Sequence, residues 1–129
     1  MTKQQENPAT VLIVNDDQKA LDLFVDLLEP EGYKVFAAQS ARRALEITSA
    51  VRTDIIICDV MMPNLDGMGF VKAIKQHTQT QKIPVIFLTA KTDPRSMIDG
   101  INVGARFYVT KPFQIDDLLA KVSKALAHR

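Results

Sequence analysis

Short apolar runs, rich in β-branched residues and separated by stretches with helical spacing, constrain the fold of this chain more than any other feature. The runs are Val11 to Val14, Tyr33 to Ala37, Ile55 to Cys58, Val85 to Leu88 and Phe107 to Val109. Runs of this length and composition predict strands. Those that start at 11, 55 and 85 are apolar throughout, which is typical of strands covered on both faces of a parallel sheet. We therefore expect these three strands to be central.

Helical patterns lie between and after these runs. The clearest stripe with i, i+3, i+4, i+7 spacing consists of Ile115, Leu118, Leu119, Val122 and Leu126. The first helix should end near Pro30 and Gly32, because proline lacks an N–H group and glycine tolerates positive φ. Ser40 should cap the second helix, and a fourth helix is expected over residues 93–104.

The alternation of strands and helices predicts an α/β fold, a (βα)5 doubly wound parallel sheet with helices on both faces. In such a sheet the ligand crevice lies at the carboxyl ends of the strands, where the strand order reverses. A length of 129 residues is enough for one domain and too short for two. We expect a flexible tail over residues 1–9 and one domain over residues 10–129.

Composition excludes several classes of function. The 16 basic and 15 acidic residues give a net charge of +1, which favours neither direct nucleic-acid binding nor an anionic membrane. Cys58 is the only cysteine, so an internal disulfide and a cysteine-based zinc site are excluded. The polar N-terminus has no apolar signal core, and no apolar run approaches the ~20 residues of a membrane span. We expect a cytoplasmic protein without membrane insertion.

Polar residues follow each of the expected central strands and the last one. They are Asn15 to Asp17, Asp59, Thr89 with Ala90, and Lys111 with Pro112. Because the carboxyl ends of parallel strands share one edge of the sheet, these residues should face one crevice. A single aspartate is more often a turn or cap residue, so the convergence of all four groups carries the inference.

Carboxylates gathered at one place repel each other unless a cation neutralises them. Oxygen ligands without histidine or cysteine favour Mg²⁺, with Mn²⁺ as a substitute, bound through one or two carboxylates and a substrate phosphate. Asp59 can attack phosphorus to give an aspartyl phosphate, and the transferring oxygens then need a cation, an ammonium group and a hydroxyl donor. Asp16 supplies a ligand for the cation, Lys111 the ammonium group and Thr89 the hydroxyl.

Four motifs resemble the receiver domain of two-component response regulators, over residues 10–128. They are VLIVNDD at 11–17, DIIICDVMMPNLDG at 54–67, PVIFLTA at 84–90 and GARFYVTKPF at 104–113. The resemblance, to a single-domain chemotaxis-regulator type, implies a flavodoxin-like strand order 2-1-3-4-5. It also implies a histidine kinase or histidine phosphotransfer protein as the phosphoryl donor, and a downstream protein target.

The same resemblance implies roles for individual residues around a metal. Asp59 matches the phosphoacceptor, and Asp16 matches a direct metal ligand. Met61 corresponds to the position that binds the metal through its backbone carbonyl, and Asn15 to one that binds it through water.

The remaining matched positions concern the phosphoryl group and the switch. Lys111 resembles the lysine that pairs with phosphate, and Ala90 the residue whose backbone amide contacts the phosphoryl group. Thr89 resembles the switch hydroxyl, Tyr108 the aromatic side chain that follows it, and the bond before Pro112 the cis peptide of this family. We expect phosphorylation to change the surface of the fourth helix, the fifth strand and the fifth helix.

Asn15 departs from the family pattern, which usually has an acid at this position. Asparagine keeps an oxygen acceptor for a metal-bound water but removes one negative charge. We therefore hypothesise weaker Mg²⁺ binding than at a site with two acids, and tighter binding in Asn15→Asp. Asp17 could orient the site or cap the first helix, and Asp66 with Gly67 is interpreted as a turn.

We expect a switch rather than an enzyme, with self-catalysed phosphoryl transfer and slow autodephosphorylation. One alternative is a degenerate receiver that binds partners without phosphorylation. A small phosphatase with an aspartate nucleophile is less favoured, because Met61 stands where its second acid would be needed. An FMN carrier is disfavoured because acids follow the first strand, where the FMN phosphate would need hydroxyls and amides.

Overall fold

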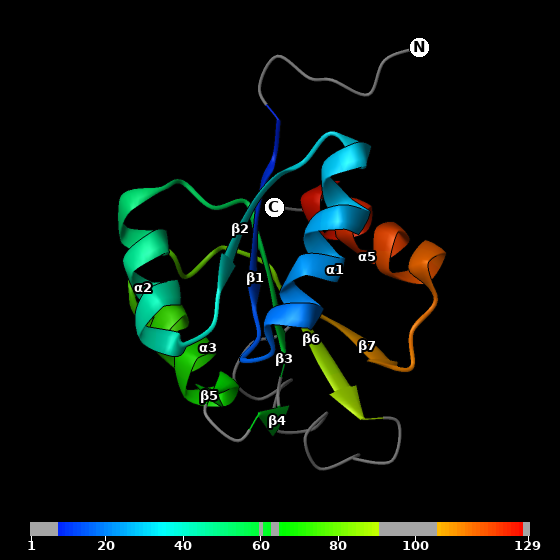
Figure 1. The fold of residues 1–129 in the computed structure, drawn as a ribbon. Helices are drawn as coiled ribbons and strands as arrows, with labels where there is room; N and C mark the ends of the chain where they lie inside the picture. The colour runs from blue at the N-terminus through cyan, green and yellow to red at the C-terminus, as the bar shows by residue number, and fades with distance from the viewer. Residues whose placement is uncertain (1–7, 60, 63–64, 91–105, 128–129) are drawn as a thin grey trace.

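A parallel sheet of five strands forms the centre of the molecule, in the order β2-β1-β3-β6-β7 (Figure 1). The computed structural model describes residues 8–59, 61–62, 65–90 and 106–127. The strands are β1 Thr10–Val14, β2 Lys34–Ala38, β3 Ile55–Asp59, β6 Val85–Ala90 and β7 Phe107–Lys111. All neighbouring pairs in this sheet are parallel. Numbered along the chain, the order is 2-1-3-4-5, which confirms the predicted fold.

The central strands are those with continuous apolar sequence. Every residue of β1 and β3 is buried, whereas β2 and β7 at the edges are only partly buried. A strand covered on both faces cannot alternate between apolar and polar residues. The prediction of three central strands is therefore confirmed.

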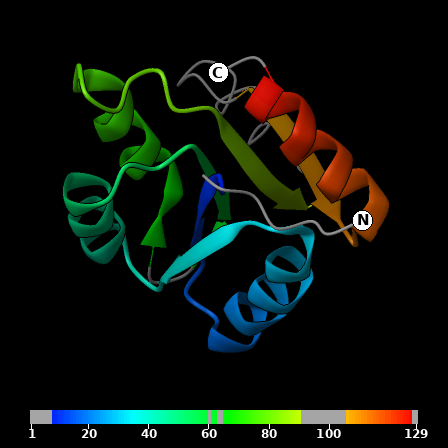
Figure 2. The ribbon, with the colours of Figure 1, turned by 90° about the horizontal axis from the view of Figure 1, so that it is seen from above.

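Helices cover both faces of the sheet. They are α1 Gln18–Leu28, the 3₁₀ turn η1 Glu29–Glu31, α2 Ala41–Ala50, α3 Gly67–Gln76 and α5 Ile115–Ala127. Figure 2 shows α1 and α5 on one side of the sheet and α2 and α3 on the other. The fourth helix expected over 93–104 lies outside the described residues. No helix in the described ranges is long and apolar enough to cross a membrane.

Local signals in the sequence set the helix ends. The Asp17 carboxylate accepts a hydrogen bond from the backbone N–H of Lys19 at 3.0 Å, so this residue caps α1. Gly32 adopts a φ of 94°, a left-handed conformation that ends η1. The Ser40 hydroxyl accepts from the N–H of Arg43 at 3.1 Å and caps α2, as predicted.

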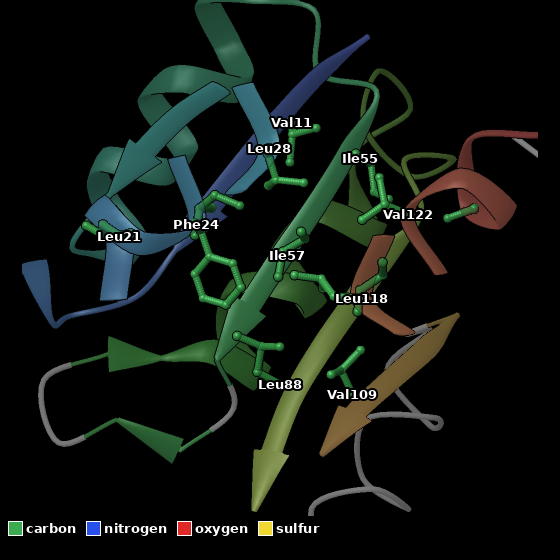
Figure 3. Close-up of a cluster of buried hydrophobic side chains, with 13 residues drawn as sticks. Val11, Leu21, Phe24, Leu28, Ile55, Ile57, Leu88, Val109, Leu118 and Val122 are labelled. Atoms are coloured by element: carbon green, nitrogen blue, oxygen red, sulfur yellow. The ribbon is translucent and has the colours of Figure 1, made fainter. Parts of the chain in front are cut away.

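Two apolar clusters, one on each face of the sheet, form the core. Successive strand residues point to opposite faces, so Ile57 joins the cluster beneath α1 and α5, while Ile56 joins the cluster beneath α2 and α3. Figure 3 shows the first cluster, where Phe24 of α1 and Leu118 of α5 approach Ile57. Cys58 is fully buried in the second cluster and serves as a small apolar side chain.

A short antiparallel pair, β4 Met61–Met62 with β5 Leu65–Asp66, follows the central strand β3. The sequence did not predict it, because strands of two residues are too short to show a periodic pattern. Asp66 lies in β5 and Gly67 begins α3, so the interpretation of these two residues as a turn was wrong.

The folded part of the chain includes the residue before β1. Ala9 is buried, and its carbonyl accepts a hydrogen bond from the N–H of Lys34 at 2.9 Å. This bond extends the pairing of β1 with β2 by one residue into the segment expected to be a flexible tail. Residues 1–7 of that segment lie outside the described residues.

Candidate functional site

The predicted site residues lie at the carboxyl edge of the sheet. Asn15 follows β1, Asp59 ends β3, Thr89 is the second-last residue of β6 and Lys111 ends β7. These strands are neighbours, and their register places Asp59 opposite Leu88 and Thr89 opposite Thr110. Topology therefore brings together residues that are up to 96 positions apart (111 − 15) in the sequence.

The Asp59 carboxylate is buried and paired with a lysine. Its side chain is 4% exposed, and Oδ2 accepts a hydrogen bond from the Nζ of Lys111, whose side chain is 45% exposed. Because β6 lies between β3 and β7, the lysine reaches across one strand to make this contact. A carboxylate that is nearly removed from water needs such a charged partner.

Asn15 also contacts Asp59. Asn15 is 4% exposed, and its Nδ2 donates to Oδ2 of Asp59 at 3.4 Å. Its Oδ1 accepts from the N–H of Asp17 at 2.9 Å, and its own N–H donates to the carbonyl of Ala38 at 3.0 Å. Sequence reasoning considered only the oxygen of this amide and missed the donor that faces Asp59.

Asp16 lies beside the buried groups and is partly exposed. Its backbone carbonyl accepts a hydrogen bond from Nε2 of Gln39 at 3.4 Å. Gln39 was not predicted as a site residue, although it follows β2 directly and the rule applied to the other strand ends would have found it.

The donor set at this edge suits a hard cation. Within the described ranges, no three His, Cys, Asp or Glu side chains gather closely enough to hold a metal. The predicted ligands are the carboxylates of Asp16 and Asp59 and the backbone carbonyl of Met61, which lies in β4 two residues beyond Asp59, and their roles as ligands stay predictions. Two carboxylates and neutral oxygens match the ligands of Mg²⁺, which keeps several waters, and not those of zinc.

The Thr89 hydroxyl is buried without a hydrogen-bond partner in the described part of the chain. Thr89 is 1% exposed. A buried polar group in this condition costs about 1–3 kcal/mol, and a role in binding or catalysis is one explanation for such a group. An incoming group with acceptor oxygens would satisfy this hydroxyl.

Tyr108 lies in β7, and Pro112 follows this strand directly after Lys111. The Tyr108 ring packs against the apolar cluster beneath α2 and α3, with its centroid 6.1 Å from that of Phe87 in β6. The peptide bond between Lys111 and Pro112 is cis, as predicted. The roles assigned to the Ala90 amide, the Met61 carbonyl and the Tyr108 rotamer stay predictions.

Known proteins share this fold and this sequence pattern. The chain is 38% identical over 112 residues to the nisin biosynthesis regulatory protein NisR of Lactococcus lactis, an alignment that covers 87% of this chain and 48% of NisR. It is 35% identical to the chemotaxis protein CheY4 of Vibrio cholerae, with a TM-score of 0.87 and coverage of 93% and 100%. A response regulator receiver domain protein from Clostridium thermocellum is 31% identical, with a TM-score of 0.84 and coverage of 93% and 95%.

The chain thus spans about half the length of curated relatives such as NisR and the response regulator SaeR, of which it covers 50%. The family model of the response regulator receiver domain matches residues 11–123. This match includes every strand of the central sheet except the first residue of β1, together with all the site residues described above. The chain belongs to the response regulator receiver domain family.

Proposed function

We propose that this chain is a phosphoacceptor switch in which Asp59 receives a phosphoryl group from the phosphohistidine of a histidine kinase or a histidine phosphotransfer protein. The observation that supports this most strongly is the buried Asp59 carboxylate, paired with Lys111 at the carboxyl edge of the sheet. A carboxylate oxygen forms the new bond to phosphorus while the bond from phosphorus to the histidine nitrogen breaks. No general base is required, because an ionised carboxylate attacks directly.

Mg²⁺, or Mn²⁺ in its place, would be held by Asp16, Asp59 and the Met61 carbonyl, with Asn15 in contact through water. When bound, the cation neutralises charge on the oxygens of the transferring group. Lys111 contributes the second positive charge, and its partly exposed side chain can move from Asp59 to a phosphoryl oxygen. Receiver domains act as signalling switches, and we place slow self-catalysed hydrolysis of the acyl phosphate in the same site.

The signal would pass through Thr89. Its partnerless buried hydroxyl supports a hydrogen bond to a phosphoryl oxygen, beside one from the Ala90 backbone amide. Movement of the threonine would change the space open to Tyr108 and so the surface formed by β7 and α5. A downstream protein would bind that surface only in the phosphorylated state.

A degenerate receiver is the second candidate, and Asn15 is the observation that favours it. A degenerate site would have no use for the paired Asp59 and Lys111, and both are present and in contact. Neither the phosphatase nor the FMN reading gains support from the family match.

The test is intact-mass analysis after incubation with acetyl phosphate, with and without Mg²⁺. We expect a Mg²⁺-dependent gain of about 80 Da in the wild type and none in Asp59→Asn. Asp54→Asn is the matched control, because Asp54 precedes the same strand at its opposite end and should leave the mass gain intact. A wild-type protein that gains no mass under any condition would contradict the proposal and support the degenerate receiver.

A further inference from the structure

The amide of Asn15 connects the start of α1 to the carboxylate of Asp59. On one side its oxygen accepts the N–H of Asp17 at 2.9 Å, and Asp17 in turn caps α1 through the N–H of Lys19. On the other side its Nδ2 donates to Oδ2 of Asp59 at 3.4 Å. The first bond determines the orientation of the amide, because only an oxygen can accept from an N–H. The group that faces Asp59 is therefore the donor.

Oδ2 of Asp59 accepts hydrogen bonds from both Lys111 and Asn15. The lysine enters from β7 and the asparagine from the end of β1, so they approach from strands on opposite sides of β3. Asp59 is 3% exposed, and a carboxylate with so little access to water depends on the protein for its donors. The backbone of Asn15 is itself fixed by its bond to Ala38, so this donor is supplied by a rigid element.

We propose that Asn15 is a positioning residue, which holds the Asp59 carboxylate in place and makes the folding of this domain largely independent of a divalent cation. The inference rests on the proposed function for the importance of Asp59 as the acceptor. An aspartate at position 15 would still accept the N–H of Asp17. It would, however, place an oxygen in place of the donor against Oδ2 of Asp59, and the two carboxylates would repel each other until a cation neutralised them.

The substitution Asn15→Asp therefore removes the donor and leaves the bond to Asp17 intact. We would measure thermal unfolding midpoints of the full chain by circular dichroism in EDTA and in millimolar Mg²⁺. For the wild type we expect little difference between the two conditions. For Asn15→Asp we expect a midpoint in EDTA lower by at least about 4 °C, most of which Mg²⁺ restores.

Two further variants separate this role from a general effect of charge. Gln39→Glu adds one negative charge at the same edge of the sheet, at an exposed position that contacts the Asp16 carbonyl and not Asp59. Gln39→Glu should lower the unfolding midpoint in EDTA by less than half of the decrease expected for Asn15→Asp. The double variant Asn15→Asp/Asp59→Asn exchanges donor and acceptor, and its midpoint in EDTA should return to within about 2 °C of the wild type.

The proposal is overturned if Asn15→Asp unfolds at the wild-type temperature in EDTA and responds equally to Mg²⁺. It is also overturned if Gln39→Glu reproduces the full effect, or if the double variant shows no recovery. None of these midpoints depends on phosphoryl transfer. A failure of Asp59 to accept phosphate would therefore contradict the proposed function and leave this inference standing. Midpoints that differ from those expected would contradict this inference and leave the proposed function standing.

Discussion

The two ends of the central strands treat buried polar groups differently. At the amino end, the N–H of Thr10 donates to Oδ2 of Asp54 at 2.8 Å, and the Thr80 hydroxyl donates to the carbonyl of Ile74 at 2.7 Å. At the carboxyl end, the Thr89 hydroxyl is buried with no hydrogen-bond partner among the described residues, and Asp59 is buried as a carboxylate. Both ends thus bury polar groups, and the carboxyl end also holds, among the described residues, a buried hydroxyl that the chain itself does not satisfy.

This difference separates stability from function along the same strands. Hydrogen bonds to buried groups stabilise the fold, whereas an unsatisfied buried group costs free energy and marks a place where a ligand could supply the missing partner. Substitutions at the amino end should therefore lower the free energy of unfolding. Substitutions at the carboxyl end that add no charge should change that free energy less, and should instead alter phosphorylation or the response to it.

The largest contrast is expected between two aspartates at the ends of β3. Asp54→Ala should lower the free energy of unfolding by about 2 kcal/mol, because the N–H of Thr10 loses its charged acceptor at a site 7% exposed. Asp59→Asn should change it by less than about 1 kcal/mol, because an oxygen acceptor remains and the released ammonium of Lys111 is well solvated. Urea unfolding measures both. Equal losses would show that the two ends contribute alike to stability.

A smaller contrast is expected between two buried threonines, each replaced by valine of similar shape. Thr80→Val should lower the free energy of unfolding by about 1 kcal/mol, since the carbonyl of Ile74 loses the nearer of its two donors and keeps the N–H of His77 at 3.4 Å. Thr89→Val should not lower it, because the hydroxyl that is removed is buried at a cost and makes no bond within the described residues. A larger loss in Thr89→Val than in Thr80→Val would reverse the comparison.

The Thr89 variants also test the switch. Thr89→Ala should still gain mass from acetyl phosphate, because Asp59 and Lys111 are retained. Binding of the downstream protein should then no longer follow phosphorylation, as measured by titration calorimetry with each form. If binding remains phosphorylation-dependent, the coupling through Thr89 is wrong.

The smallest expected effect is the change in stability with pH that arises from Lys75, near the amino end of the central strands. Nζ of Lys75 donates to the carbonyls of Gln81 and Ile83 at 3.1 and 2.7 Å. Burial, and then the charge of Arg106, lower the pKa of Lys75 below its ordinary 10.5. Between the lowered folded pKa and 10.5 the unfolded chain binds more protons, so this residue makes stability rise with pH.

The measurement compares the wild type with Lys75→Met by urea unfolding at several pH values. The stability of the wild type relative to the variant should increase as pH rises toward 10.5. Lys72→Met, at an exposed position on the same helix, is the control for the loss of one lysine from α3. Tyr33, whose pKa burial raises above 10.0, is common to all three proteins and cancels. A flat difference for Lys75→Met as well would show that its pKa is not lowered.

The strands of the sheet were predicted well, because the apolar pattern that indicates a strand lies within the strand itself. Runs that are apolar on both faces identified β1, β3 and β6, and the polar residues after them located the site. The ends of strands were less predictable. β6 continues through Thr89 and Ala90, because these residues pair with Thr110 and Lys111 of β7 and not because of their side chains.

The sequence predicted which residues meet at the carboxyl edge of the sheet and missed one arrangement among them. Strand order places Asp59, Thr89 and Lys111 together, so a list of strand-end residues was sufficient. The orientation of the Asn15 amide was not predictable, because it depends on the backbone N–H of Asp17 at the start of α1. Such a contact exists only after helix and strand have been placed relative to each other.

The continuous burial of the central strands also has a consequence for how the chain selects one alignment of those strands. Residues Ile55 to Cys58 are apolar in succession, so a slip of β3 by one position would exchange its two faces and still bury apolar side chains. The polar residues at its ends oppose such a slip. A slip in either direction would take Asp54 away from Thr10 and Asp59 away from Lys111. The proposed phosphoacceptor therefore also marks where its strand must stop, and selection for signalling at this position would maintain the alignment of the sheet.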